Sequence, residues 1–214
     1  MIITRVKKSS SVIDVQKPPK IVVEHLEPKL STWLQFEYEN ASKLLGKNIL
    51  FTNVKSRRAR EKLRRLGGVE RQSVLDIFPH EKLVILDPRA KKALAPRDLD
   101  GDTIAVVGGI LGEHPPRGRT RALLTSKAPK AKTRNLGREQ FTIDSAVYVA
   151  KTIIGGKKIS AIPLKRGLIL RVKLKPSGVY EVELPYVYPI VANKPLISRK
   201  LLKYLTGTKS PKIV

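Results

Sequence analysis

Residues 108–116 place three glycines, an acid, a histidine and two prolines in one short loop that follows an apolar stretch of the chain. Gly108 and Gly109 have no Cβ, so the backbone there can approach a ligand closely or turn sharply. The paired prolines restrict the backbone where the loop ends. In open α/β sheets, ligands bind in loops that follow the carboxyl ends of strands. The loop therefore predicts a small-molecule pocket beside the arginines that come after it, Arg117 and Arg119.

Two further segments, Asp87-Pro88-Arg89 and residues 135–144, are candidates to close the same pocket. Each alone is typical of an ordinary turn, but loops at one edge of a parallel sheet can gather around one pocket. The chain lacks the Gly-x-Gly-x-x-Gly fingerprint of dinucleotide sites, and Gly46-Lys47-Asn48 does not complete a P-loop. No serine lies in a nucleophile elbow. The sequence therefore gives no indication that the pocket binds NAD or ATP or catalyses acyl transfer.

Strands and helices must position these loops, and the apolar pattern predicts both. We expect strands at 20–24, 48–52, 83–86, 103–107 and 121–125, and helices at 31–46, 56–66, 142–154 and 198–205. Residues 127–134 are expected to form a basic loop, and 168–174 with 179–184 a β-hairpin. This order predicts an α/β fold, an open sheet with helices on both faces followed by a C-terminal hairpin.

The charge of the chain is strongly unbalanced: 43 Lys and Arg stand against 18 Asp and Glu, a formal net charge of +25 in 214 residues. The usual partner of such a surface is nucleic acid or an RNA-rich particle, because each neutralised phosphate releases counterions. A solvated lysine-rich face is the alternative. We expect a basic flexible arm at 1–19 and a single domain at 20–214.

Several kinds of site are excluded by what the chain lacks. It has no cysteine, which excludes disulfides and cysteine-based zinc sites. Its three histidines, His25, His80 and His114, have no metal-ligand spacing, so we expect no metal. No apolar run reaches the roughly 18 residues that span a bilayer, and no signal-peptide pattern opens the chain. We expect a cytoplasmic protein with no membrane contact.

Three strings carry a resemblance to a known family: LDPRA at 86–90, GGILGEHPPRGRT at 108–120 and NLGREQFTIDSA at 135–146. Together they resemble the SPOUT class of methyltransferases. The segments 23–38 and 182–205 narrow the resemblance to the branch typified by a yeast enzyme that methylates an arginine of a small-subunit ribosomal protein. The resemblance implies a SPOUT-type open sheet with a deep C-terminal trefoil knot, which is a rare exception to the rule against knotted chains.

The resemblance also implies S-adenosylmethionine as the cofactor, held in the knot. By motif match, the residues that would hold it are Leu86, Pro88, Gly108, Gly109, Ile110, Gly112, His114, Pro115, Leu136, Gly137, Gln140, Phe141 and Thr142. For His114, hydrogen bonding that shapes the loop and action as a base are both open. The implied pocket uses all three loops that the sequence singles out.

Methyl transfer to arginine requires the acceptor nitrogen in line with the sulfonium methyl, about 3 Å away. A guanidinium is charged at any ordinary pH, so carboxylates must orient it and some path must remove a proton. The candidate catalytic acids are Glu113 in the glycine loop, and Glu24 and Glu37 near the N-terminus. For Glu24 and Glu37, a surface acid or an ion pair is the alternative. Asp144 at the start of a predicted helix is a further candidate acid, for which stabilising the positive end of its own helix is favoured over catalysis.

Arg117, Arg119 and Arg121 are expected to contact the substrate, with plain surface charge as the alternative. The resemblance favours an arginine of a small-subunit ribosomal protein, whereas the charge favours RNA, either rRNA or tRNA, since like charges would repel an isolated basic ribosomal protein. An assembling ribosomal subunit fits both. A catalytically inactive protein that binds RNA or the ribosome is the third alternative. The sequence leaves open whether the protein is a monomer or a homodimer.

Overall fold

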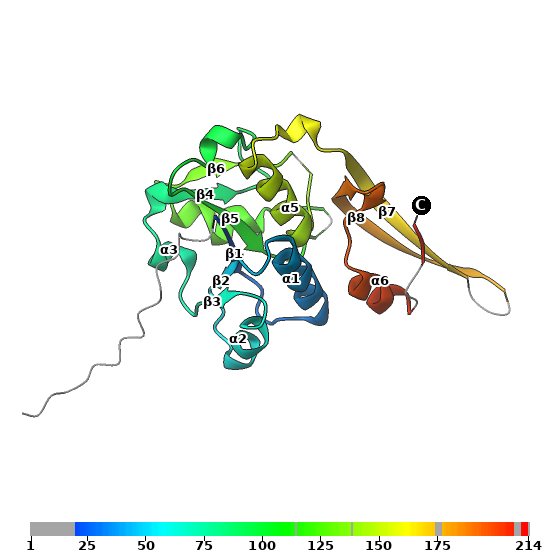
Figure 1. The fold of residues 1–214 in the computed structure, drawn as a ribbon. Coiled ribbons are helices and arrows are strands. Elements are labelled where there is room, and N and C mark those ends of the chain that lie inside the picture. The colour runs from blue at the N-terminus through cyan, green and yellow to red at the C-terminus, as the bar shows by residue number, and fades with distance from the viewer. Residues whose placement is uncertain (1–19, 114, 138, 174–176, 208–210, 214) are drawn as a thin grey trace, which may run out of the picture.

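The computed structural model of the protein describes residues 20–113, 115–137, 139–173, 177–207 and 211–213. The arm predicted at 1–19 and the cofactor residue His114 lie outside these described residues. The described chain forms two sheets and the helices that pack on them (Figure 1).

The larger sheet has six parallel strands in the order β3-β2-β1-β5-β4-β6. They are β1 (Ile21–His25), β2 (Leu50–Thr52), β3 (Gly68–Val69), β4 (Leu83–Leu86), β5 (Ile104–Gly109) and β6 (Lys132–Arg134). From β1 the chain moves outward to β3 on one side, then crosses to β4 and β5 on the other. The order therefore reverses between β1 and β5, and ligands of open sheets bind at such switch points.

Helices cover both faces of this sheet, as predicted (Figure 1). They are α1 (Thr32–Leu44), α2 (Arg57–Leu63), α3 (Val74–Ile77), α4 (Arg119–Leu123), α5 (Ile143–Ile154) and α6 (Arg199–Thr206), with 3-10 turns at His80–Lys82, Pro96–Asp98, Thr125–Lys127 and Ile159–Ala161. Val23 faces the core under α1 and α5, whereas Val22 and Val106 face a second core with Val74 and Leu124. Alternate strand residues thus point to opposite faces.

The ends of α1 follow the signals in its sequence. Ser31 accepts a hydrogen bond from the Leu34 amide at 3.2 Å, which satisfies one of the free donors of the first turn. Gly46 lies just beyond the last turn with φ of +58°, a conformation that glycine adopts without strain. These signals place α1 directly after the β1 turn, beside the switch point.

The second sheet is antiparallel, in the order β10-β7-β8-β9. It consists of β7 (Leu164–Lys173), β8 (Val179–Val191), β9 (Lys194–Pro195) and β10 (Lys212–Ile213). Leu168, Leu184 and Tyr188 form a separate small core with Leu202 of α6. α6 contacts α1, and β8 contacts α5, so this sheet lies beside the larger one, at the right of Figure 1.

One predicted strand is wrong. Residues 121–125 lie in α4 and the turn after it. The sequence pattern also omits β6, which lies inside the predicted basic loop, and the two-residue strands β3, β9 and β10. A short apolar run does not distinguish a helix from a strand. Here the run supplies Leu124, a buried side chain that lies between α4 and the 3-10 turn after it. β6 pairs through its backbone with β4 at the edge of the sheet, so its polar side chains give no apolar signal. No described helix is long and apolar enough to cross a membrane.

Candidate active site

A cavity opens at the carboxyl ends of β4 and β5. Three segments meet around it: 86–89 after β4, 107–120 at the end of β5 and beyond, and 136–146, which leads from β6 into α5. The three loops that the sequence predicts to share one pocket therefore do share it.

Most of the predicted cofactor residues line this cavity. They are Leu86, Pro88, Gly108, Ile110, Gly112, Leu136, Gly137, Gln140 and Phe141, joined by Glu113, Arg117 and Arg119 from the predicted catalytic and substrate sets. Residues without a predicted role line it too, among them Asp87, Leu111, Thr120, Glu139 and Ile143. These residues lie next to the predicted ones in the same three segments, so their position within each motif is the sequence signal that indicates them.

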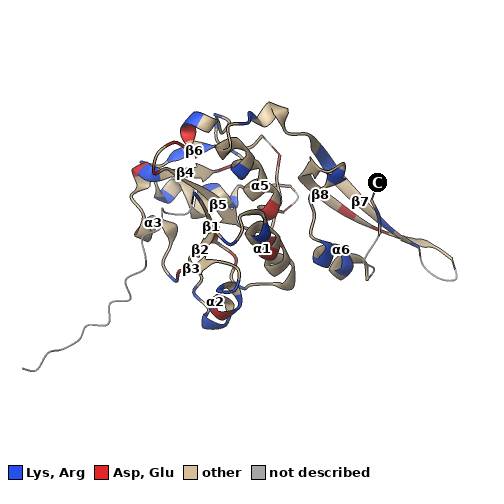
Figure 2. Ribbon diagram, in the orientation of Figure 1, with Lys and Arg blue, Asp and Glu red and all other residues tan. Residues whose placement is uncertain are grey.

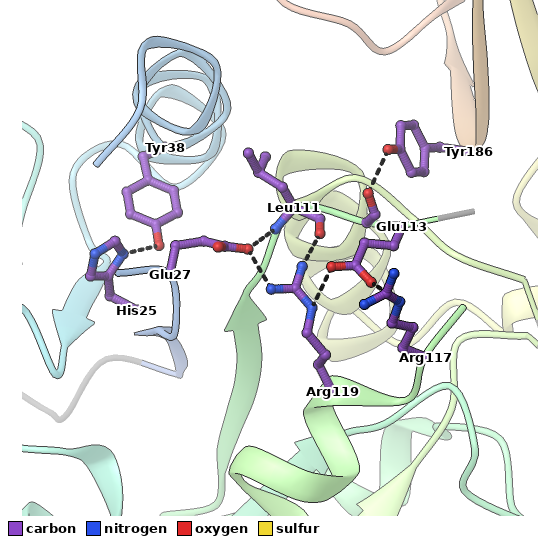
Figure 3. A network of polar contacts seen from close by, with 9 residues as sticks. His25, Glu27, Tyr38, Leu111, Glu113, Arg117, Arg119 and Tyr186 are labelled. Carbon is purple, nitrogen blue, oxygen red and sulfur yellow. Dashed lines mark hydrogen bonds and ion pairs between the residues drawn. The ribbon is translucent and has the colours of Figure 1, made fainter. Parts of the chain in front are cut away.

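Gly109, which is also predicted to hold the cofactor, is not among the residues that line the cavity. A Cβ built on it would lie 2.1 Å from the Tyr38 hydroxyl. That hydroxyl lies 3.0 Å from His25 Nδ1, in a buried contact between α1 and the end of β1 (Figure 3). Burial lowers the pKa of His25, against a smaller opposing effect of the nearby Glu27 carboxylate. Gly109 is thus a glycine because Tyr38 packs against β5.

Three more predicted residues lie outside the cavity lining. Pro115 is exposed on the outside of the loop. Thr142 is buried at the start of α5, where its hydroxyl donates to the Asp144 carboxylate at 2.7 Å. Arg121 turns toward Asp87, with its Nε 3.3 Å from Oδ2. Thr142 therefore shapes α5, and Arg121 holds the loop after β4.

Gly112 has no space for a side chain. A Cβ there would lie 2.4 Å from the Tyr186 ring and 2.9 Å from Gln140 Oε1. The Tyr186 hydroxyl donates to the Gly112 carbonyl at 2.9 Å, which ties β8 to the glycine loop (Figure 3). The backbone of this loop therefore forms one wall of the cavity, where a side chain would displace its neighbours.

Acidic and basic side chains alternate in a network of ion pairs that contains the cavity-lining residues Glu113, Arg117 and Arg119 (Figure 3). Arg119 Nη1 lies 3.0 Å from Glu27 Oε1, and Arg119 Nε lies 3.5 Å from Glu113 Oε1. Arg117 Nε lies 2.9 Å from the other Glu113 oxygen. Glu113 and the two arginines thus lie together. Glu27, which belongs to the N-terminal motif, has no role in the sequence-based prediction.

Glu37 is buried behind the cavity. Its Oε2 accepts a hydrogen bond from the Ile143 amide at 2.9 Å, and its Oε1 one from Trp33 Nε1 at 2.6 Å. Burial, and then the Asp144 carboxylate, raise the pKa of Glu37 to about 8. Burial also raises the pKa of Asp144. Because Ile143 lines the cavity and Glu37 does not, Glu37 is placed to position the start of α5.

Glu24 is also absent from the cavity, which argues against its predicted catalytic role. Its side chain is 1% exposed and accepts hydrogen bonds from the Ser73 hydroxyl at 2.6 Å and the Val74 amide at 2.9 Å. The Thr52 hydroxyl is a third donor. Through these three hydrogen bonds, Glu24 of β1 holds β2 and the start of α3 in place. The structure therefore gives Glu24 a structural role.

Comparison with known proteins decides the family. A family model described as "Protein arginine N-methyltransferase SFM1-like" matches residues 20–210. The chain belongs to this SFM1-like family. Protein arginine N-methyltransferase SFM1 of Saccharomyces cerevisiae is 31% identical over 150 residues, which cover 63% of this chain and 70% of the relative. The predicted resemblance is confirmed, and with it the prediction of an S-adenosylmethionine-dependent methyltransferase.

The fold agrees with that assignment. The structure of yeast SFM1 complexed with SAM gives a TM-score of 0.75 at 24% identity, covering 90% of this chain and 92% of that chain. A Trm10 structure from Thermococcus kodakaraensis gives a TM-score of 0.52 at 16% identity, covering 66% and 95%. At these identities the likeness concerns the fold, and it supports the predicted α/β architecture with a parallel sheet.

The cavity fits the cofactor of the SFM1-like family, S-adenosylmethionine. Leu86, Ile110, Leu136 and Phe141 provide apolar walls that suit an adenine ring. The loop backbone at Gly112 supplies a wall with no side chain, in the manner expected of a close approach to a ligand. These residues would hold the cofactor, which supplies an electrophilic methyl group when bound.

Because Glu24 has a structural role, we expect its substitution to lower the stability of the protein without changing its affinity for the cofactor. Glu24→Gln replaces three hydrogen bonds to a charged group by weaker neutral ones and makes the Ser73 hydroxyl accept where it donated, so we expect the free energy of unfolding to fall by about 2–3 kcal/mol. Affinity for S-adenosylmethionine should be unchanged. Urea unfolding and calorimetric titration measure the two quantities. Glu61→Gln, in an exposed pair with Arg57, is the control. Lost methyl transfer at unchanged stability would restore Glu24 as a catalytic residue.

Proposed function

We propose that this protein transfers a methyl group from S-adenosylmethionine to an arginine side chain of a small-subunit ribosomal protein. The observation that carries the proposal is the cavity itself: in a chain of the SFM1-like family, it has a Gly112 wall and the carboxylate of Glu113 at its mouth. An enzyme that methylates a cationic group needs both a cofactor pocket and a nearby anion.

Glu113 is the acid best placed for the chemistry. It lines the cavity with a side chain that is 37% exposed, so a substrate can reach it. The acceptor nitrogen of arginine forms a bond to the methyl carbon as the carbon–sulfur bond breaks, and that nitrogen then loses a proton. We propose that the Glu113 carboxylate orients the guanidinium and accepts the proton or passes it to water. Of the three predicted catalytic acids, only Glu113 has this access.

We also propose that the chain between β6 and α5 is knotted, as in the SPOUT class. Two observations support this. β6 lies at one edge of the sheet, yet α5 packs on α1 and the central strands. The segment that joins them, 136–142, contributes to the same cavity as the loops after β4 and β5. A chain that passes between those loops would be fixed there, which would make the cavity rigid.

Contact with ribosomal RNA is the proposed role of the excess positive charge. On α2 and its C-terminal end, Arg57, Arg58, Lys62, Arg64 and Arg65 are exposed, and Figure 2 shows this helix as largely basic. Glu61 is the one acid in this stretch. Such a surface contacts phosphates without reading bases. RNA would then bring a basic enzyme to a basic ribosomal protein, and RNA as the methyl acceptor is the second candidate.

A labelling experiment tests the proposal. Calorimetric titration of S-adenosylmethionine into the purified protein comes first, and we expect saturable binding. The protein is then incubated with tritiated cofactor and small ribosomal subunits from the organism that encodes it, and protein is separated from RNA. Label in a protein arginine supports the proposal, and label in RNA supports the alternative. Binding that is absent at millimolar cofactor would contradict both and favour an inactive RNA-binding protein.

A further inference from the structure

We infer that Glu27 and Glu113 together form the binding site for the guanidinium of the substrate, and that Arg119 fills this site until the substrate displaces it. The inference rests on the proposed arginine methyltransferase function. It assigns a role to Glu27 and makes Arg119 an internal competitor of the substrate.

The first observation is the set of contacts that Arg119 makes (Figure 3). Each of its three guanidinium nitrogens has a partner: Nη1 lies 3.0 Å from Glu27, Nε lies 3.5 Å from Glu113, and Nη2 donates to the Leu111 carbonyl. A planar guanidinium carries its five N–H donors in a fixed fork and is recognised by acceptors in its own plane. Two carboxylates and a carbonyl around one guanidinium are therefore a complete arginine site.

The second observation is that Glu27 is held in place without Arg119. Its Oε1 accepts a hydrogen bond from the Leu111 amide at 2.9 Å, and its side chain is only 15% exposed. Leu111 belongs to the glycine loop, so the loop that forms the cofactor cavity also fixes this carboxylate. The acceptor would stay in position when Arg119 leaves, as a preorganised site requires.

The third observation concerns Glu113. Its Oε2 is shielded from solvent and accepts no hydrogen bond from any described residue, although Arg117 Nε lies 2.9 Å away. Arg117 itself is 78% exposed, and ion pairs this exposed contribute little. Glu113 thus has unused acceptor capacity next to a weakly held cation. An entering guanidinium can use that capacity while Arg117 swings into solvent.

The position of the pair indicates a route for the substrate. Arg119 lines the cofactor cavity, whereas Glu27 lines a second groove formed by residues after β1, after β2 and around α3, including Lys29, Asn53 and Asp76. The contact between Glu27 and Arg119 therefore lies between the groove and the cavity. A substrate arginine that enters along the groove reaches both carboxylates by replacing Arg119, and its guanidinium then faces the cofactor cavity.

Binding of a small arginine compound tests the inference directly. The probe is N-acetyl-arginine methylamide, titrated calorimetrically into the full chain saturated with S-adenosylhomocysteine. Arg119→Ala removes the competitor, so we expect the affinity for the probe to rise about tenfold or more. When only a fraction of the protein has its site open, the apparent dissociation constant is the intrinsic one divided by that fraction. The uncharged isostere N-acetyl-citrulline methylamide should bind weakly to both forms. Methylation by Arg119→Ala should show a lower KM with kcat little changed.

Two further variants complete the test. Glu27→Gln in the Arg119→Ala background should lose the gain in affinity, because one of the two carboxylates is gone. Arg171→Ala removes an arginine that pairs with Glu181 in the second sheet, so it serves as the matched control and should bind as the unaltered protein does. Arg119→Lys should show a smaller gain, since an ammonium cannot make all three contacts, and it carries the test if Arg119→Ala does not fold.

The outcomes separate this inference from the proposed function. If the cofactor binds and methyl transfer occurs but Arg119→Ala and Arg119→Lys bind the arginine probe no better, the inference is wrong and the proposed function stands. Equal gains for the arginine and citrulline probes would also contradict it, because they would indicate a loosened loop. If the cofactor does not bind at all, it is the proposed function that fails.

Discussion

Gly112→Ala is expected to weaken the binding of S-adenosylmethionine strongly. The new Cβ would lie 2.4 Å from the Tyr186 ring and 2.9 Å from Gln140 Oε1, closer than such atoms approach one another. Tyr186 is fixed on β8 and donates to the Gly112 carbonyl, so the loop must move away from β8 and lose this hydrogen bond. Because the same backbone forms a cavity wall, we expect affinity to fall about 100-fold, or about 2.7 kcal/mol. Calorimetric titration measures the change.

A second glycine provides the matched control. Gly155 ends α5 with φ of −73°, and a Cβ there would meet only ordinary contacts, at 3.4 Å or more. Gly155→Ala should therefore leave cofactor affinity unchanged. Thermal unfolding of both variants shows whether the Gly112 effect is local: we expect a moderate loss of stability beside a large loss of binding. Normal cofactor affinity in Gly112→Ala would mean that the cofactor does not lie against this wall.

The sequence predicts the cavity well because its signals are local. The glycine loop, the turn after β4 and the segment before α5 each lie where a strand or helix ends, and parallel strands bring such ends to one edge. Local sequence patterns do not show which residues of a loop face the cavity. Gly108 and Gly109 are adjacent, yet only Gly108 lines it, because the Tyr38 hydroxyl of α1 packs where a Cβ of Gly109 would lie.

The errors concern contacts between distant parts of the chain. Glu24, Glu37 and Glu27 lie in one short motif, and nothing in their spacing separates the buried, donor-bound carboxyl groups of Glu24 and Glu37 from that of Glu27, which pairs with the cavity-lining Arg119. Their partners come from α3, α5 and the glycine loop, respectively. β6 was missed for the same reason, since its pairing with β4 depends on backbone contacts that side-chain patterns do not record.

The buried pair of Glu37 and Asp144 predicts that stability falls as pH rises. Burial and the neighbouring carboxylate raise the pKa of Glu37 to about 8, from an ordinary value of 4.5 in the unfolded chain. Between these values the folded protein binds a proton that the unfolded chain has released, so folding is favoured at low pH. The free energy of unfolding should therefore decrease by up to about 1.4 kcal/mol per pH unit from pH 4.5 to 8.

Asp144→Asn isolates this effect. The side-chain carbonyl of the variant keeps the acceptor for the Thr142 hydroxyl and the Ser145 amide, and the Asn40 side-chain amide can turn over to accept from the new NH2 group. The variant thus preserves the hydrogen bonds and removes one buried charge, which lets the pKa of Glu37 fall toward its ordinary value. At pH 9 we expect the variant to be more stable than the unaltered protein by about 1–2 kcal/mol, since each pKa unit of repulsion corresponds to about 1.4 kcal/mol.

Urea unfolding of both proteins between pH 5 and 9 measures the difference. Titration of the many lysines changes net repulsion in both proteins alike, so the difference between the two curves reports on the buried pair. The curves should lie close together near pH 5 and separate above pH 7. Parallel curves would show that Glu37 is already ionised at neutral pH. In that case the Ile143 amide and Trp33 would be holding a carboxylate, and α5 would begin beside the cofactor cavity against a fixed negative charge.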